Sequence, residues 1–198
     1  MKVGILNAGG GSVFSLANSL KLINAEAVSI NKPDELLRFD RVILPGVGHF
    51  DKGCACIEEE KWKVGFERYL SDNANRLLGI CLGMQLMFLD SEESAIGAKG
   101  LGLIAEHCTK LCSSDEWKVP NVGWRSLEIR GSDKHFLASV ERHETFYFVH
   151  SYAVLPKNIF DLAENLSEYS MTSHSNNVFL SAFRKDNIYG CQFHPEKS

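Results

Sequence analysis

In the first half of the chain, short apolar runs alternate with segments in which apolar residues have helical spacing. Four short apolar runs predict buried strands at residues 2–6, 27–30, 41–44 and 76–80. Between and after these runs, helical spacing predicts helices at residues 13–22, 33–37, 58–70 and 82–89. Strands that alternate with helices are typical of a parallel sheet covered on both faces. We therefore expect an α/β fold, doubly wound around a mostly parallel sheet with flanking helices.

The second half of the chain changes to short β-like runs, at residues 127–129, 145–149, 179–183 and 188–193. These runs predict extra β hairpins that extend the sheet or surround it. No linker divides the 198 residues, so we expect a single domain over residues 1–198. In open α/β sheets, ligands bind beyond the carboxyl ends of the strands. The loops after Leu6, Leu44 and Ile80 are therefore expected to carry the chemistry.

Composition narrows the possible function classes. Apolar residues make up 44% of the chain and charged residues 23%, as in folded globular proteins. A net charge of −4 argues against nucleic-acid binding as the main role, because phosphates need a basic face. No apolar run reaches the ~20 residues that span a membrane, and no signal peptide is visible. Six cysteines without CxxC spacing predict neither a metal site nor a disulfide framework. We expect a cytoplasmic protein without membrane contact or cofactor.

The segment Gly79-Ile80-Cys81-Leu82-Gly83 joins a predicted strand to a predicted helix. This is the strand–turn–helix elbow that presents a nucleophile, with Cys81 at its tip. The two glycines let the backbone turn sharply, and the positive end of the helix favours thiolate over thiol. An isolated cysteine is more often a buried structural residue. The flanking glycines and the change from strand to helix favour the nucleophile here.

A thiolate nucleophile needs a base, and the end of the last predicted strand offers one. His194 and Glu196 are two residues apart, so in extended chain they project to the same face. Glu196 would then fix the tautomer of the imidazole, and Pro195 would end the strand. The alternative is a solvated chain end in which the two residues meet by chance.

Two glycine-rich loops offer backbone N–H groups. Residues 45–48 (PGVG) could point N–H groups into a cavity and, with the N–H of Leu82, stabilise an oxyanion. An ordinary tight turn is the alternative for that loop. Residues 9–12 lack the lysine of a phosphate loop, and no acidic residue suits a ribose, so nucleotide binding is not expected. A lone His150 is more often structural, and Trp124 and Tyr147 would ordinarily be core residues.

Four segments together resemble a known family. In order along the chain they are PGVG, LLGICLGMQLMF, FVHSY and QFHPEKS. They resemble the class I (triad) glutamine amidotransferases, of flavodoxin-like architecture, and most of all the glutaminase subunits of imidazole glycerol phosphate synthase. The resemblance covers the chain from Lys2 to Ser198.

The resemblance implies a role for each matching residue. Cys81 would attack the side-chain amide of glutamine, His194 would transfer the proton, and Glu196 would orient the imidazole. Val47 and Leu82 would supply the oxyanion N–H groups. Residues implied to bind the substrate are Gly48, Gln85, His150, Ser151 and Tyr152. Residues implied to face a partner are Trp124, Tyr147 and Lys197. The implied partner is a (β/α)8-barrel cyclase that forms a heterodimer and receives ammonia through a channel, in histidine biosynthesis.

Two segments depart from the family pattern. Residues 7–12 read NAGGGS where Asp-Tyr-Gly-x-Gly-Asn is usual, and residues 120–125 read PNVGWR where PHMGWN is common. Both changes leave the triad intact and bear on the acceptor synthase. The alternative partner is therefore a synthase that amidates sugars for surface glycans. Two further alternatives are a non-enzymatic regulatory relative and a cysteine peptidase, which would act on peptides or esters and not depend on glutamine.

Overall fold

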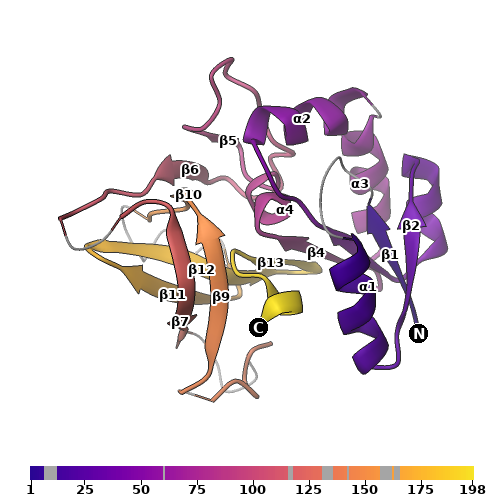
Figure 1. Ribbon diagram of the computed structural model, residues 1–198. Coiled ribbons are helices and arrows are strands. Elements are labelled where there is room, and N and C mark those ends of the chain that lie inside the picture. The colour runs from indigo at the N-terminus through magenta and orange to yellow at the C-terminus, as the bar shows by residue number, and fades with distance from the viewer. Residues whose placement is uncertain are drawn as a thin grey trace.

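The computed structural model describes residues 1–6, 13–59, 61–115, 118–130, 136–141, 143–156, 162 and 166–198 (Figure 1). The loop at residues 7–12, where the sequence departs from the family pattern, lies outside these ranges. Within the described ranges, no helix has the length and apolar character needed to cross a membrane.

Eight of the described strands form one sheet, in the order β2-β1-β3-β4-β13-β12-β11-β8. Its parallel part consists of β2 (Glu26–Ile30), β1 (Lys2–Leu6), β3 (Arg41–Leu44), β4 (Arg76–Ile80) and β13 (Ile188–Cys191). Its antiparallel part consists of β12 (Asn177–Lys185), β11 (Glu168–His174) and β8 (Glu128–Arg130). The mostly parallel sheet with added hairpins is thus confirmed. Because β4 and β13 are parallel neighbours, their carboxyl ends meet at one edge of the sheet.

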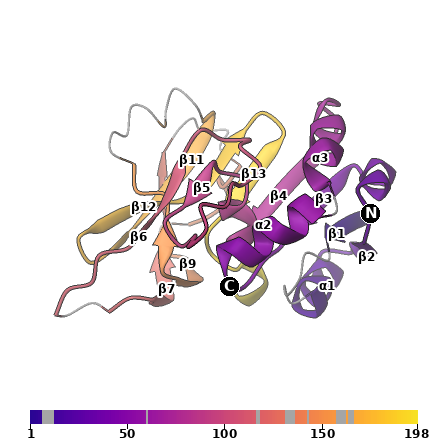
Figure 2. The same ribbon diagram turned by 90° about the horizontal axis from the view of Figure 1, so that it is seen from above.

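Helices cover both faces of the parallel part, as expected for a doubly wound fold (Figure 2). On one face, α2 (Phe50–Glu59), α3 (Trp62–Leu70) and the short η1 (Pro33–Arg38) bury their apolar sides against β1, β3 and β4. On the other face, α1 (Val13–Leu22) buries Leu16 and Leu20 against Val3, Ile5 and Ile43. Burial of each large apolar side chain contributes roughly 1.5–3 kcal/mol, so these two layers stabilise the sheet that carries the site.

A ribbon of β7 (Asn121–Ser126) and β9 (Thr145–His150) packs over the antiparallel part of the sheet (Figure 1). The ring of Phe148 lies 5.6 Å from the ring of Phe179 and 5.7 Å from that of Phe193, measured between centroids. A second small sheet contains β10 (Tyr152–Ala153), β6 (His107–Lys110) and β5 (Asp90–Ser91). Aromatic packing therefore fixes β9 beside the carboxyl end of β13.

The structure corrects two of the predicted helices. The helix expected at residues 58–70 is two helices, α2 and α3, separated at Lys61, whose φ of 56° interrupts the helical conformation. The helix expected at residues 82–89 ends after one turn, as α4 (Leu82–Gln85). Residues 82–88 are buried and Gln85 is the one polar residue among them, so the segment has no periodicity that marks a helix end. The final strand is also shorter than expected, because β13 ends at Cys191 and Pro195 begins the 3-10 turn η2 (Pro195–Lys197).

Candidate functional site

The elbow expected around Cys81 is present at the carboxyl end of β4. Cys81 has φ 53° and ψ −111°, a strained conformation for a residue with a side chain, and α4 begins at the next residue. A Cβ on Gly79 would lie 2.8 Å from the carbonyl oxygen of Gly83, and a Cβ on Gly83 would lie 1.8 Å from the carbonyl oxygen of Leu44. Both glycines are therefore required by close packing of backbone on backbone.

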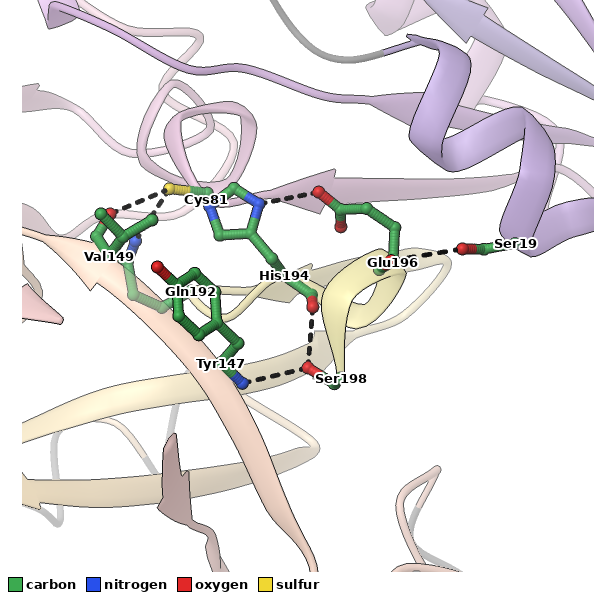
Figure 3. Close-up of polar contacts among 8 residues, drawn as sticks. All are labelled: Ser19, Cys81, Tyr147, Val149, Gln192, His194, Glu196 and Ser198. Atoms are coloured by element: carbon green, nitrogen blue, oxygen red, sulfur yellow. Dashed lines mark hydrogen bonds and ion pairs between the residues drawn. The ribbon is translucent and has the colours of Figure 1, made fainter. Parts of the chain in front are cut away.

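Cys81, His194 and Glu196 converge although they come from distant parts of the chain. Figure 3 shows the imidazole of His194 between the Cys81 sulfur and the Glu196 carboxylate. His194 Nδ1 lies 2.9 Å from Glu196 Oε1. His194 Nε2 is buried without a hydrogen-bond partner in the described part of the chain, on the side of the ring that faces Cys81. The arrangement leaves this nitrogen available to take a proton from the thiol.

The segment that carries His194 and Glu196 is tied to β9. The backbone N–H of His194 donates to the carbonyl oxygen of Tyr147 at 2.9 Å. The Ser198 hydroxyl donates to the carbonyl oxygen of His194 at 2.7 Å and accepts from the N–H of Tyr147 at 3.0 Å (Figure 3). These bonds fix the backbone of His194, and the hydrogen bond to Glu196 fixes the orientation of its ring.

Electrostatics favour an ion pair between His194 and Glu196. Burial lowers the pKa of His194, but the neighbouring Cys81 sulfur and the Glu196 carboxylate outweigh it and raise that pKa to about 9. Burial raises the pKa of Glu196, but its hydrogen bond to His194 outweighs this effect and leaves the pKa below its usual value. A carboxylate beside an imidazolium stabilises the protonated base that forms when the thiol loses its proton.

A cavity of about 190 Å³ opens in front of the sulfur. It is lined by Val47, Gly48, Cys81, Leu82, Gln85, Glu93, Val149, His150, Ser151, Tyr152 and His194. Every residue that the family resemblance assigned to substrate or oxyanion binding is in this lining. Glu196 stands behind His194 and is not part of it. The cavity brings together the loops after β3, β4, β9 and β13.

The loop at residues 45–48 reaches the cavity because glycine lets it approach the elbow. A Cβ on Gly46 would lie 2.9 Å from Leu82 Cβ and 3.0 Å from the backbone nitrogen of Gly83. Gly48 has a φ of 107°, in the region that favours glycine. The PGVG loop thus lies against the first turn of α4, whose N–H groups have no partner within the helix.

Two lining residues, Glu93 and Val149, were not anticipated from the sequence. Glu93 follows β5, and its Oε2 accepts a hydrogen bond of 2.8 Å from the N–H of Phe50, at the start of α2. Its neighbours Ser91, Glu92 and Ser94 are polar and form no motif that marks a site. Only the docking of this loop against α2, 43 residues earlier in the sequence, brings the carboxylate to the cavity.

His150 is a structural residue that also forms part of the cavity wall. Its Nδ1 lies 3.0 Å from the carbonyl oxygen of Tyr152, and its Nε2 lies 3.0 Å from Asn121 Nδ2. Because the Tyr152 carbonyl can only accept, Nδ1 carries the proton and Nε2 accepts from the amide. Burial lowers the pKa of His150 to about 4, so the imidazole stays neutral.

Trp124, Tyr147 and Lys197 lie outside the cavity and form one cluster beside it. The rings of Trp124 and Tyr147 are 5.9 Å apart, and Lys197 Nζ lies 5.5 Å from the centroid of the Tyr147 ring. Half of the Trp124 side chain is exposed, which contradicts the default expectation of a core residue. The Tyr147 ring in turn lies 6.5 Å from that of His194, so the cluster is continuous with the site.

The described residues contain no group of three or more His, Cys, Asp or Glu side chains that could hold a metal ion. The six cysteines are free thiols. The chemistry available at the cavity is that of a thiol with an adjacent, oriented imidazole.

Comparison with known proteins assigns the family. Residues 5–198 match the family model described as Glutamine amidotransferase class-I. The chain belongs to this family. It is 37% identical to the imidazole glycerol phosphate synthase subunit HisH 2 of Methanococcus maripaludis, over 99% of this chain and 92% of that protein. It is 36% identical to the chloroplastic imidazole glycerol phosphate synthase hisHF of Arabidopsis thaliana, over 99% of this chain and 32% of that protein.

The fold of this class-I glutamine amidotransferase also matches solved structures. One, a crystal structure of a glutamine amidotransferase, superposes with a TM-score of 0.70 at 16% identity and covers 99% of this chain and 91% of that one. At this level of identity the match supports the fold alone, and that fold agrees with the α/β architecture expected from the sequence.

Proposed function

We propose that the chain is the glutaminase subunit of an imidazole glycerol phosphate synthase, with Cys81 as nucleophile, His194 as base and Glu196 as its orienting group. The observation that carries this proposal is the convergence of these three side chains at one edge of the sheet, in front of a cavity of about 190 Å³. The similarity to the subunits named above supports the choice of synthase.

The proposed reaction has two halves. The Cys81 sulfur, whose proton has passed to His194, attacks the side-chain amide carbon of glutamine. The N–H groups of Val47 and Leu82 stabilise the oxyanion of the tetrahedral intermediate. His194 gives its proton to the leaving nitrogen, so ammonia departs and a thioester remains. Water, deprotonated by His194, then releases glutamate and restores the thiol, and the balance is glutamine and water to glutamate and ammonia.

The far wall of the cavity suits the amino-acid end of glutamine. Both N–H groups of the Gln85 amide are used, for the carbonyl oxygen of Tyr152 at 2.8 Å and for Gln192 Oε1 at 3.0 Å. Gln85 can therefore offer a ligand only its oxygen, which fits an ammonium group, as does the Glu93 carboxylate. The backbone of Gly48 and Ser151 remains for the α-carboxylate.

We assign the outer face of the β7–β9 ribbon to the partner. Val122 pairs with Val149, and Trp124 pairs with Tyr147, so apolar side chains from both strands stand side by side, with Lys197 at their edge. Exposed apolar groups with an aromatic anchor are typical of interface centres. The proposed partner is a (β/α)8-barrel cyclase in a cytoplasmic heterodimer, which receives ammonia through a channel. The whole chain, residues 1–198, forms the single glutaminase domain.

A two-substrate assay with the barrel cyclase tests the proposal. The Cys81→Ala variant should abolish product formation from glutamine and leave product formation from added ammonium salts intact, because the cyclase active site is untouched. Cys112→Ala, at an exposed cysteine, is the matched control and should retain both activities. Loss of both activities in Cys81→Ala would contradict the division of labour. Copurification with a sugar-modifying synthase in place of the cyclase would contradict the histidine pathway.

A further inference from the structure

The Cys81 sulfur has a second polar neighbour besides the triad. The side chain of Gln192 is only 1% exposed, and its Nε2 lies 3.6 Å from Cys81 Sγ (Figure 3). We propose that Gln192 holds the Cys81 sulfur in its anionic, nucleophilic form, and that a directional network of buried amides aims its N–H at that atom. The inference rests on the proposed function only in taking Cys81 as the nucleophile.

The direction of the network follows from one carbonyl group. The carbonyl oxygen of Tyr152 can only accept, and Gln85 Nε2 lies 2.8 Å from it. This contact fixes which end of the Gln85 amide is the NH2 group. The same Nε2 lies 3.0 Å from Gln192 Oε1, so the oxygen of Gln192 must face Gln85. The NH2 group of Gln192 is then the end that faces Cys81.

The network is anchored at its far end by His150 and Asn121. His150 donates from Nδ1 to the carbonyl oxygen of Tyr152 at 3.0 Å and meets Asn121 Nδ2 at Nε2, also at 3.0 Å. Because burial lowers the pKa of His150 to about 4, this end does not change protonation at neutral pH. The Tyr152 carbonyl oxygen therefore accepts from both His150 and Gln85, and this arrangement is unchanged over the pH range in which a thiol titrates.

The thiol and the thiolate of Cys81 prefer different neighbours. The sulfur lies 3.9 Å from the carbonyl oxygen of Val149, a group that can accept from a thiol and repels an anion. The N–H of Gln192 is closer, and a donor binds an anion more strongly than a neutral thiol. The titratable groups around the sulfur are His194, with Glu196 behind it, and Cys191; Glu93, His150 and Tyr152 lie across the cavity. Of the side chains that contact or face the sulfur, Gln192 is a donor that does not itself titrate.

Alkylation of Cys81 by iodoacetamide tests the inference without glutamine or a partner. The rate on the full chain is followed against pH by mass spectrometry of the Cys81 peptide, with the exposed Cys112 as the reference in the same molecule. Gln192→Met keeps the length and removes the donor. Gln192→Glu keeps an acceptor for Gln85 and places a charge beside the sulfur. We expect the midpoint for Cys81 to rise by about one pH unit in Gln192→Met, and further in Gln192→Glu.

The matched control is Asn187→Asp. Asn187 is a buried amide just before β13, and its Nδ2 donates to the carbonyl oxygens of Leu70 and Asp72, both at 3.2 Å. Its loss should lower the melting temperature and leave the Cys81 midpoint in place. An unmoved midpoint in folded Gln192→Met would overturn the inference and leave the glutaminase proposal standing. A shifted midpoint in a protein whose Cys81 is not labelled by a glutamine-mimicking diazo-ketone would support the inference and contradict the glutaminase proposal.

A measurement on unmutated protein covers the case in which neither Gln192 variant folds. Gln85 and Gln192 are the two glutamines of the chain, so ¹⁵N labelling of glutamine gives two side-chain amide signals. The Gln192 signal should move with pH through the midpoint of Cys81 alkylation, and should not move in Cys81→Ala. A Gln192 signal that stays fixed through that midpoint would overturn the inference.

Discussion

Substitution of one elbow glycine should misplace the nucleophile. In Gly83→Ala, the new Cβ would stand 1.8 Å from the carbonyl oxygen of Leu44, whereas real Cβ contacts do not fall below 3.0 Å. The two backbones must therefore separate by at least 3.0 − 1.8 = 1.2 Å. Neither side can yield by a rotamer change, because the clash is with backbone. Overpacking of this kind costs about 1–3 kcal/mol of folding stability.

The effect on activity should be larger than the effect on stability. The separation moves the first turn of α4 away from β3, and with it Cys81 and the N–H of Leu82. A displacement of about 1 Å at a reacting group costs roughly 100-fold in rate, so glutamate formation by Gly83→Ala should fall by about that factor. The assay is glutamate release by the complex, with the melting temperature measured on the same samples.

The matched control is Gly97→Ala. Gly97 has a φ of 70° and no atom within 4 Å of an added Cβ, so this change introduces conformational strain without a clash. It should cost about 1 kcal/mol of stability and leave glutamate release unchanged. If Gly83→Ala matches the wild type in melting temperature and in rate, the packing argument for the elbow is wrong.

Three further outcomes follow from the site. Glutamate release should fall less in Glu196→Gln than in His194→Ala, because the first change keeps the base; equal residual rates would show that Glu196 does more than orient the ring. The pKa of His194 is about 9 in the folded protein and 6.5 for an unperturbed histidine. Protonation of His194 therefore stabilises the folded state in full below pH 6.5, and this stabilisation is lost as the pH rises through 9. The free energy of unfolding should therefore fall more steeply between those pH values in the wild type than in His194→Gln, and parallel urea-melt curves would refute this. Trp124→Ala should weaken cyclase binding by about tenfold or more in a calorimetric titration, with little change in melting temperature, since half of the side chain is exposed; unchanged affinity would place the partner elsewhere.

The first half of the fold could be predicted because its strands are buried on both faces. Such strands appear as uninterrupted apolar runs, and β1, β3 and β4 have the bounds that the pattern gives. The strand β11 was missed because most of its buried positions are polar: Ser170, Thr172 and His174 are each less than 5% exposed. The Ser170 hydroxyl lies 3.0 Å from that of Ser181 on β12, a partner that only the folded sheet provides.

The candidate site also contains residues that local sequence patterns predict and residues that they do not. Cys81, His194 and Glu196 could be chosen as candidates because each stands in a short local pattern with a chemical meaning. Glu93 and Gln192 could not, because each acquires its role from a tertiary contact, with Phe50 in one case and with Cys81 and Gln85 in the other. The positions of Glu93 and Gln192 in the sequence do not predict those contacts.

The sheet order has a consequence for how the protein is made. The strand β13 is the last in sequence, yet it lies between β4 and β12 in the interior of the sheet. During synthesis, β4 and its cysteine leave the ribosome more than 100 residues before His194. A nascent or partly folded chain therefore carries the Cys81 thiol without the imidazole that the proposed function needs, and this pair forms only when the final strand is inserted.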